Sequence, residues 1–317
     1  MYSATLTGPR NFEWSIIPIP LPGPDEVRIR LEGCGICHSN LALWEGTPWA
    51  QYPTPYGSLG HEGWGIVDEV GEKVKEFHPG ERVTGLTYHS FAEYDLARSN
   101  EILKVPPSLS HVPIPGEAFG CAMNIFERAR IKKGETVAII GIGFLGALLT
   151  LLAKEAGAKV IGISRRNYSL EIAKEMGADE IIQMKDDGLI LSRVKEITNG
   201  NLFDCVIEAV GKQFSLDLAT DIVSTYGRLI IAGYHQDGPR KVNVQAWNWK
   251  AIDVINAHER DSKIYLNGIQ KALAKLEMNP EITKKLLTHS IHFKELKNAF
   301  ELLERRPDGF LKAYIYF

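Results

Sequence analysis

Two short segments near the N-terminus carry side chains that can ligate a metal ion. One reads Gly33-Cys-Gly-Ile-Cys-His-Ser-Asn40 and the other reads Gly60-His-Glu-Gly-Trp-Gly-Ile-Val67. Thiolates, imidazoles and carboxylates are the usual ligands of zinc, so these segments are candidates for a metal site. Cys34 and Cys37 also form a Cys-x-x-Cys pair, but no second Cys or His pair follows at the spacing of a structural zinc site. We therefore do not expect Cys34 to bind metal.

A glycine-rich loop in the middle of the chain has the form of a dinucleotide-binding turn. It lies between a predicted strand at 136–140 and a predicted helix at 147–155, and a second strand is predicted at 159–163. In such a turn the first glycine permits the tight bend, the second lets the backbone approach a pyrophosphate, and the third lets the helix pack closely on the strand. The residues of this turn that we expect to bind the cofactor are Gly141, Gly143, Phe144, Leu145 and Gly146.

The residues at the end of the second strand distinguish NAD from NADP. An acidic side chain here would bind the adenosine ribose of NAD and would repel the 2′-phosphate of NADP. The chain instead has Ser164, Arg165 and Arg166, whose hydroxyl and guanidinium groups can bind a phosphate through charge-assisted hydrogen bonds. We therefore predict NADP as the cofactor. NAD is the alternative, with the two arginines stacking on the adenine.

Hydrophobic patterns along the chain predict two kinds of domain. Up to about residue 110, short strand-like runs are separated by turns rich in proline and glycine. From about 113 to about 258, strands alternate with helices, as in the βαβ units of a parallel sheet. The fold class predicted is α/β, with a doubly wound parallel sheet of the Rossmann type and a second, mostly β domain. The strands predicted with definite bounds are 27–31, 65–70, 82–86, 136–140, 159–163, 204–208 and 228–232, and helical periodicity marks 266–276 and 293–303 before a strand-like end at 312–317.

Composition and charge exclude several classes of protein. Of the 317 residues, 44% are hydrophobic and 24% are charged, which is enough for one or two proper cores. The 36 basic and 39 acidic residues leave no positive excess for wrapping nucleic acid or an anionic membrane. Four cysteines are too few for a disulfide framework, and residues 1–10 do not read as a signal peptide. We expect a cytoplasmic protein that acts on small molecules, with no nucleic acid or membrane as partner.

The two metal-type segments, followed in this order by the glycine loop, resemble the zinc-containing medium-chain alcohol and polyol dehydrogenases. The resemblance spans nearly the whole chain. It implies a zinc-dependent oxidoreductase that transfers a hydride between NADP(H) and an alcohol, aldehyde or ketone. It also implies a GroES-like catalytic domain at 1–116 and 259–317 and a dinucleotide-binding domain at 117–258, in a homo-oligomer of two or four chains. The continuous run at 80–94 leaves no room for the second, structural zinc lobe of larger members.

The resemblance assigns the zinc ligands residue by residue. Cys37 and His61 are ligands, and Glu62 is a neighbouring or alternative ligand. The third ligand has two candidates, Glu117 and Cys121, which would lie on one face of a helix. In the polyol dehydrogenases a glutamate precedes the first loop glycine by 24 residues, as Glu117 does here, so we choose Glu117 and expect Cys121 to be a packed side chain.

Around these ligands the resemblance implies a proton relay. Ser39 matches the hydroxyl that contacts the substrate oxygen and begins the relay. Asn40 stands where the family commonly has an aspartate that orients the ligand histidine, and Ala42 stands where many members have a relay histidine. His38, which by resemblance lies beside the cofactor, is the expected substitute in the relay.

Other residues are expected near the cofactor. Gly233 and Tyr234 follow the predicted strand 228–232, at the end of the sheet where ligands of open α/β folds bind. By resemblance, Asn256 and His258 pass near the nicotinamide. Lys312 resembles a basic residue that lies near the cofactor phosphates.

Two other functions stay open. A zinc-free reductase of the same superfamily, acting on quinones or enones, would hold no stoichiometric metal. A non-catalytic protein would bind NADP and show no turnover. The presence of Cys37, His61 and Glu117 favours the zinc enzyme.

Overall fold

The computed structural model describes residues 1–185 and 187–317, which form two compact units. Unit 1 contains Met1–Cys121 and Arg260–Phe317, and unit 2 contains Ala122–Glu259. The first boundary falls inside helix α2 (Gly116–Ala129), whereas the sequence placed it at the start of this segment. In the part of the chain that the structure describes, no helix has the length and apolar character needed to cross a membrane.

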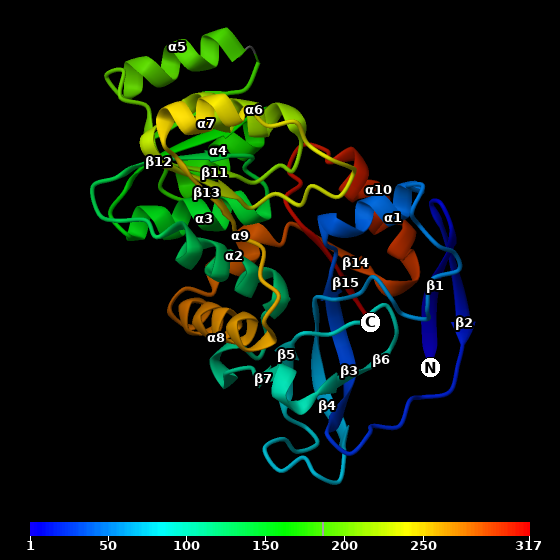
Figure 1. Ribbon diagram of the computed structural model, residues 1–317. Coiled ribbons are helices and arrows are strands. Elements are labelled where there is room, and N and C mark those ends of the chain that lie inside the picture. Colours follow the sequence, from blue (N-terminus) through cyan, green and yellow to red (C-terminus); the bar gives the residue numbers. More distant parts are fainter. Residues whose placement is uncertain (186) are drawn as a thin grey trace. The chain divides into compact units, whose positions relative to one another are not determined.

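Unit 2 is built on a six-stranded sheet in which every neighbouring pair is parallel (Figure 1). Its strands are β8 (Thr136–Ile140), β9 (Lys159–Ser164), β10 (Glu180–Gln183), β11 (Phe203–Glu208), β12 (Val223–Ile231) and β13 (Asp253–Asn256). They lie in the order β10-β9-β8-β11-β12-β13. This is the strand order of the Rossmann fold, with a topological switch point between β8 and β11.

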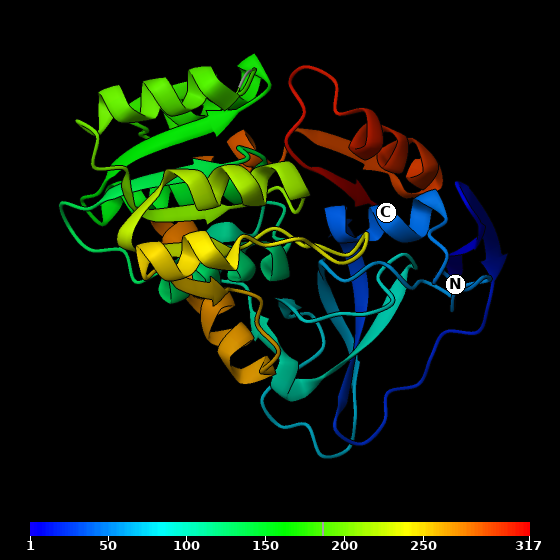
Figure 2. The same ribbon diagram turned by 45° about the horizontal axis from the view of Figure 1, so that its top comes forward.

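Helices cover both faces of this sheet (Figure 2). They are α3 (Phe144–Glu155), α4 (Asn167–Glu175), α5 (Asp187–Ile197), α6 (Gln213–Ile222) and α7 (Val244–Lys250). Helix α3 packs with α4, and α5 packs with α6. The consecutive residues Val137, Ala138, Ile139 and Ile140 are all fully buried. Successive side chains of a strand point to opposite faces, so this run requires apolar partners on both.

Unit 1 contains a two-stranded hairpin and a larger, mostly antiparallel sheet (Figure 1). Its strands are β1 (Tyr2–Gly8), β2 (Asn11–Ile16), β3 (Glu26–Gly35), β4 (Gly63–Val70), β5 (Arg82–Gly85), β6 (Tyr94–Arg98), β7 (Ile102–Lys104), β14 (His289–His292) and β15 (Ala313–Tyr316). The large sheet has the order β14-β15-β3-β4-β5-β7, and β6 also pairs with β3. The C-terminal strand β15 thus joins the sheet formed by the N-terminal part of the chain.

The remaining elements of unit 1 are short helices and one long one. They are η1 (His38–Asn40), α1 (Leu41–Glu45), η2 (Ser99–Glu101), η3 (Pro107–Leu109), α8 (Ser262–Met278), α9 (Glu281–Leu286), η4 (Phe293–Glu295) and α10 (Leu296–Arg305). The predicted α/β class, with a Rossmann sheet and a mostly β domain, is confirmed. The hairpin β1–β2 and the short strands β6, β7, β10, β13 and β14 were not among the strands that the sequence predicted with definite bounds.

An aromatic cluster fixes α10 of unit 1 to the N-terminal elements. The ring of Phe300 lies 5.1 Å from the rings of Phe12 and Trp44, and 5.9 Å from that of Phe91, between centroids. Phe300, Trp44 and Phe91 are fully buried. Packed aromatic side chains bury large apolar areas, so this cluster is a major contribution to the stability of the unit.

We predict that Phe300→Ala lowers the free energy of unfolding of unit 1 by about 3–5 kcal/mol, because it leaves a cavity among three rings. Met278→Ala is the matched control, since Met278 ends α8 in the same unit and is 79% exposed. It should change stability by less than about 0.5 kcal/mol. Urea unfolding followed by circular dichroism measures both; equal losses in the two variants would contradict the role of the cluster.

Candidate metal centre and cofactor site

The pairing of β3 with β4 brings the two metal-type segments together. The strands are antiparallel, with Cys34 opposite Gly63. Cys37 comes just after the end of β3, and His61 and Glu62 come just before the start of β4. The N–H of Gly35 donates to the carbonyl of Glu62 at 3.1 Å, which holds the two loops at the same end of the sheet.

Three side chains of these loops form a compact donor set. Cys37, His61 and Glu62 each place one potential ligand atom within 4.8 Å of the others. The hydroxyl of Ser39 donates to Sγ of Cys37 at 3.1 Å. One sulfur, one imidazole nitrogen and one carboxylate oxygen suit zinc, whereas magnesium and calcium prefer oxygen ligands alone.

A backbone carbonyl fixes the ring of His61. Nδ1 of His61 lies 3.0 Å from the oxygen of Leu59, and Asn40 donates to the same oxygen from Nδ2 at 2.7 Å. A carbonyl can only accept, so Nδ1 carries the proton and Nε2 is left as the ligand atom. Asn40 therefore acts on His61 through a shared acceptor. The sequence held no signal for Leu59, because every residue has a carbonyl.

Leu59 itself has an unusual backbone conformation. Its φ is +72°, in the left-handed region that residues other than glycine rarely adopt. Such residues are concentrated at functional sites, where the surrounding structure holds them in place. Here the conformation directs the carbonyl of Leu59 to His61 and Asn40, with which it forms the two hydrogen bonds described above.

The charges of the donor set attract a cation. Burial alone would lower the pKa of His61, but the negative charges of Cys37, Glu117 and Glu62 outweigh it and raise this pKa to about 10. Without a metal ion, the imidazole thus holds a proton where a metal would supply positive charge. This is the behaviour expected of residues that are arranged to bind a metal.

Glu62 is also bound by a buried lysine. Nζ of Lys312 lies 2.6 Å from Oε2 and 2.8 Å from Oε1 of Glu62, and it donates to the carbonyl of Ile36 at 3.2 Å. The two side chains are only 2% and 7% exposed. Gly35 makes room for the pair, because a Cβ there would lie 1.9 Å from Oε2 of Glu62. The expectation that Lys312 binds the cofactor stays a prediction; its ammonium neutralises Glu62.

Glu117 lies in the first turn of α2 and has a phenol as its partner. The hydroxyl of Tyr265, on α8, donates to Oε1 of Glu117 at 2.5 Å and also interacts with the thiol of Cys121. Burial raises the pKa of Cys121 to about 12. Glu117 is not one of the three residues of the compact donor set, although its charge acts on His61. Tyr265 was not predicted, because it lies far from Glu117 in the sequence and in no recognisable motif.

The predicted relay residues follow Cys37 directly in the chain. Ser39 is half-buried and contacts its sulfur, as described above, whereas His38 is exposed on η1. The roles of both in proton transfer stay predictions.

In unit 2 the glycine loop follows β8, at the switch point of the sheet. Gly141 has φ +95°, and a Cβ there would lie 2.5 Å from the side chain of Val210, in the loop after β11. A Cβ on Gly146 would lie 2.0 Å from the carbonyl oxygen of Gly141. Gly143 faces open space within 4 Å and is the N-cap of α3, which begins with Phe144 and Leu145. The loop therefore has the cradle and the free helix N–H groups that a pyrophosphate needs.

The predicted phosphate-binding residues end β9. Ser164 is buried as the last residue of the strand, Arg165 is exposed, and Arg166 is the N-cap of α4. The guanidinium of Arg165 lies over the ring of Phe214, 5.3 Å from its centroid. The segment thus presents the guanidinium of Arg165, held by a cation–π contact, beside the N-terminus of α4. It contains no carboxylate that would repel a phosphate.

A buried glutamate that the sequence did not single out organises the loops after β11 and β12. Oε1 of Glu208 accepts hydrogen bonds from the N–H groups of Val210 and Gly211 at 2.8 Å and from the hydroxyl of Ser215 at 2.7 Å. Its Oε2 lies 2.9 Å from Nε2 of His235, whose Nδ1 accepts from Nε of Arg240 at 2.9 Å. The only signal for Glu208 was an acidic residue at the end of an apolar strand.

Two of the residues predicted at the cofactor lie together. The rings of Tyr234 and His258 are stacked, with centroids 5.4 Å apart and planes at 20°. They follow β12 and β13, at the carboxyl ends of the strands. Gly233 is packed close to Glu208, and Asn256 accepts from the N–H of His258 at 3.1 Å. Their role in binding a cofactor stays a prediction.

Comparison with known proteins places both units in one family. Residues 23–107 match the alcohol dehydrogenase GroES-like domain, and residues 145–274 match the zinc-binding dehydrogenase domain. The chain belongs to the zinc-type alcohol dehydrogenase family. It is accordingly an oxidoreductase of the alcohol dehydrogenase type.

Relatives of this zinc-type dehydrogenase differ in what they act on. The chain is 27% identical to a sorbitol dehydrogenase of Bacillus subtilis, over 100% of this chain and 97% of the relative. It is 29% identical to an L-threonine 3-dehydrogenase of Pyrococcus abyssi, over 92% of each chain. A zinc-binding dehydrogenase of Sinorhizobium meliloti, whose structure was solved with NADP, has a TM-score of 0.83 at 24% identity, over 100% of this chain and 99% of the other. This last likeness shows the fold alone.

We predict that Lys312→Met destabilises the metal-free dehydrogenase by about 3–5 kcal/mol, because it leaves the charge of Glu62 buried without a partner. Adding Glu62→Gln to this variant removes the unpaired charge and should restore most of the loss. Urea unfolding of protein treated with a chelator compares the two variants. If the double variant is as unstable as the single one, the loss comes from packing and the ion pair is not its cause.

Proposed function

We propose that this dehydrogenase is zinc-dependent and transfers a hydride between NADP(H) and an alcohol or carbonyl substrate. The observation that carries the proposal is the donor set of unit 1, in which a thiol, an imidazole and a buried carboxylate converge at the end of β3 and the start of β4. Burying these polar groups costs free energy, and apolar side chains would stabilise the fold better at these positions. The set is therefore better explained by a role in binding.

We propose Cys37, His61 and Glu117 as the zinc ligands. The argument is one of charge. Glu62 is already paired with Lys312 at 2.6 Å, so a metal ion at Glu62 would have to compete with an ammonium for the same carboxylate. Two anionic ligands and one neutral imidazole then cancel the charge of Zn²⁺ and leave a fourth position open for substrate. In this arrangement Tyr265 holds Glu117 through one oxygen and leaves the other for the metal.

In the proposed reaction, zinc supplies Lewis acidity, which lowers the pKa of an alcohol hydroxyl or polarises a carbonyl. The protein's own residues would orient the ligands and move the proton. Leu59 and Asn40 keep the His61 ring in the tautomer that presents Nε2. In the proposed relay, the Ser39 oxygen would receive the substrate's hydroxyl proton, while the proton that Ser39 now donates to Cys37 would be released towards solvent. His38 is exposed and offers a route for this proton.

The proposal predicts about one zinc per chain, and Glu117 rather than Cys121 as the third ligand. Glu117→Gln should lose most of the bound metal after dialysis, because it removes an anionic ligand, whereas Cys121→Ser should retain it. Metal analysis measures the stoichiometry. The charge-transfer absorption of the cobalt-substituted protein reports the number of thiolate ligands. Wild-type protein with no metal would refute zinc dependence and favour the quinone or enone reductase; loss of metal only in Cys121→Ser would reverse the choice of ligand.

The proposal also predicts a preference for NADPH that depends on the end of β9. Replacing Arg165 and Arg166 with glutamine should weaken NADPH binding at least about tenfold, because each arginine can make a charge-assisted hydrogen bond to the 2′-phosphate. NADH, which lacks this phosphate, should be affected much less. Fluorescence titration with both cofactors measures the two dissociation constants. Arg193→Gln, on α5 of the same unit, is the control for a lost surface charge. Equal losses for NADPH and NADH would refute the phosphate role.

A further inference from the structure

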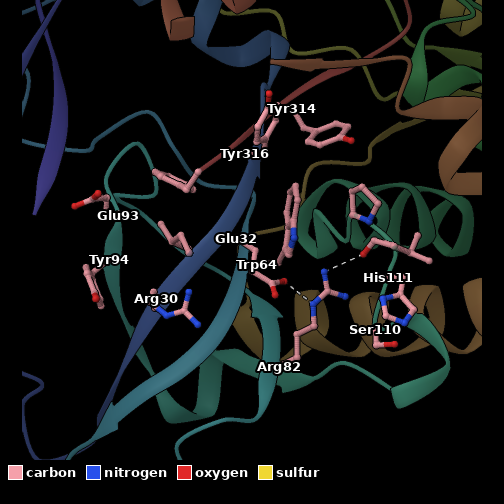
Figure 3. A pocket seen from close by; sticks show the side chains of 14 residues that line it. Arg30, Glu32, Trp64, Arg82, Glu93, Tyr94, Ser110, His111, Tyr314 and Tyr316 are labelled. Carbon is pink, nitrogen blue, oxygen red and sulfur yellow. Dashed lines mark hydrogen bonds and ion pairs between the residues drawn. The ribbon is translucent and has the colours of Figure 1, made fainter. Parts of the chain in front are cut away.

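A hollow that shares no residue with the donor set lies on the large sheet of unit 1 (Figure 3). Its volume is about 570 Å³, in the range of sites for small molecules. The strands β3, β4, β5, β6 and β15 and the turn after η3 provide its walls. In Figure 3, Trp64 stands in the middle of the lining, with Arg82 below it, Arg30 to one side and Tyr314 above.

Trp64 forms a fixed wall with an unused donor. Its ring lies against the backbone of Gly33, where a Cβ would come within 2.3 Å of it, and 5.8 Å from the ring of Tyr314 between centroids. Trp64 is only 3% exposed. Nevertheless, no residue in the described ranges 1–185 and 187–317 accepts a hydrogen bond from its indole N–H. Nε1 itself is not fully buried, so the N–H reaches the hollow and can donate to a ligand there.

Arg82 is held rigidly at the floor of the hollow. Its Nε donates to Glu32 at 2.6 Å, and its two terminal nitrogens donate to the carbonyls of Leu109 and Val112 at 2.7 and 3.0 Å. Its side chain is 13% exposed. Three fixed contacts pre-organise a guanidinium, so that its remaining N–H groups can bind a ligand with little loss of entropy.

Arg30 supplies a positive charge that nothing in the described chain neutralises. Figure 3 shows it on β3, apart from the ion pair between Glu32 and Arg82. The other carboxylate at the rim, Glu93, accepts from the N–H of Tyr2 at 2.7 Å. Among the described residues Arg30 has neither an ion pair nor a hydrogen bond. The lining thus contains two guanidiniums and two carboxylates, and Arg30 is the guanidinium whose donors are still available to a ligand.

The rest of the lining is aromatic. Tyr316 is 44% exposed, and Tyr94, Tyr314 and Phe317 are half-buried. The guanidinium of Arg28 lies over the ring of Tyr94, 5.9 Å from its centroid. Aromatic side chains arranged around fixed donors bind flat rings well, because ring faces stack on them while polar substituents meet the donors.

We propose that this hollow binds a small molecule that combines an aromatic ring with one anionic group, a carboxylate or a phosphate. The anion meets Arg30 and the free N–H groups of Arg82, and the ring lies among the tyrosines with an acceptor towards the indole of Trp64. This site is separate from the proposed metal centre and does not depend on it. Trp64 nevertheless follows Glu62 by two residues on the same segment, so an occupant would contact the strand that begins at the metal centre.

The test is calorimetric titration of the full-length protein with phenyl phosphate, with inorganic phosphate and phenol as probes of the anion and the ring alone. Phenyl phosphate should bind saturably, with one site per chain, and at least about tenfold more tightly than either fragment. Arg30→Gln should weaken it at least about tenfold, since it removes a charge-assisted contact. Trp64→Phe, which removes only the indole N–H and part of the ring, should weaken it severalfold.

Two control variants make the result decisive. Arg98→Gln removes an exposed arginine at the end of β6, outside the hollow, and should leave binding unchanged. The double variant Arg165→Gln/Arg166→Gln tests whether the probe binds in unit 2 instead. The proposal is overturned if wild-type protein shows no saturable binding, if Arg30→Gln binds as well as Arg98→Gln, or if only the unit 2 variant loses affinity. None of these outcomes bears on zinc dependence.

Discussion

The backbone pairing of β3 with β4 is the constraint on which the rest of unit 1 depends. Its register sets Cys34 opposite Gly63, so that the loops with Cys37 and His61 leave the sheet at one end. The same two strands carry Arg30 and Trp64 into the hollow on the large sheet. A slip of one residue would exchange the faces of every side chain and would destroy both features at once. The long, continuous β3 is therefore as important to the chemistry as the ligands are.

Charge, rather than packing, determines how the buried polar groups of unit 1 are arranged. Glu62 and Lys312 neutralise each other, and Tyr265 stabilises Glu117, while His61 responds to the remaining negative charge with a raised pKa. Each buried charge thus has a partner or awaits a cation. We therefore expect stability to change little when uncharged residues at the edge of the site are replaced. Loss of one member of a buried charged pair should lower stability strongly.

The sequence predicted what depends on local pattern and missed what depends on distant contacts. The glycine loop and β8 were recognisable because turn, strand and helix follow one another directly, whereas the short edge strands β10 and β13 have little apolar patterning to identify them. Cys37 and His61 stand in motifs. Tyr265 and the partner of Lys312 could not be predicted, because only the fold brings α8 and β15 to the residues they contact.

The shared carbonyl of Leu59 has a consequence for substitutions at this site. The ring nitrogen of His61 that holds the proton is chosen by a main-chain oxygen, which no side-chain substitution removes. Asn40 reaches His61 only through that oxygen. Replacing the side chain at position 40 would therefore change one hydrogen bond of the carbonyl and leave the one to Nδ1 of His61 in place.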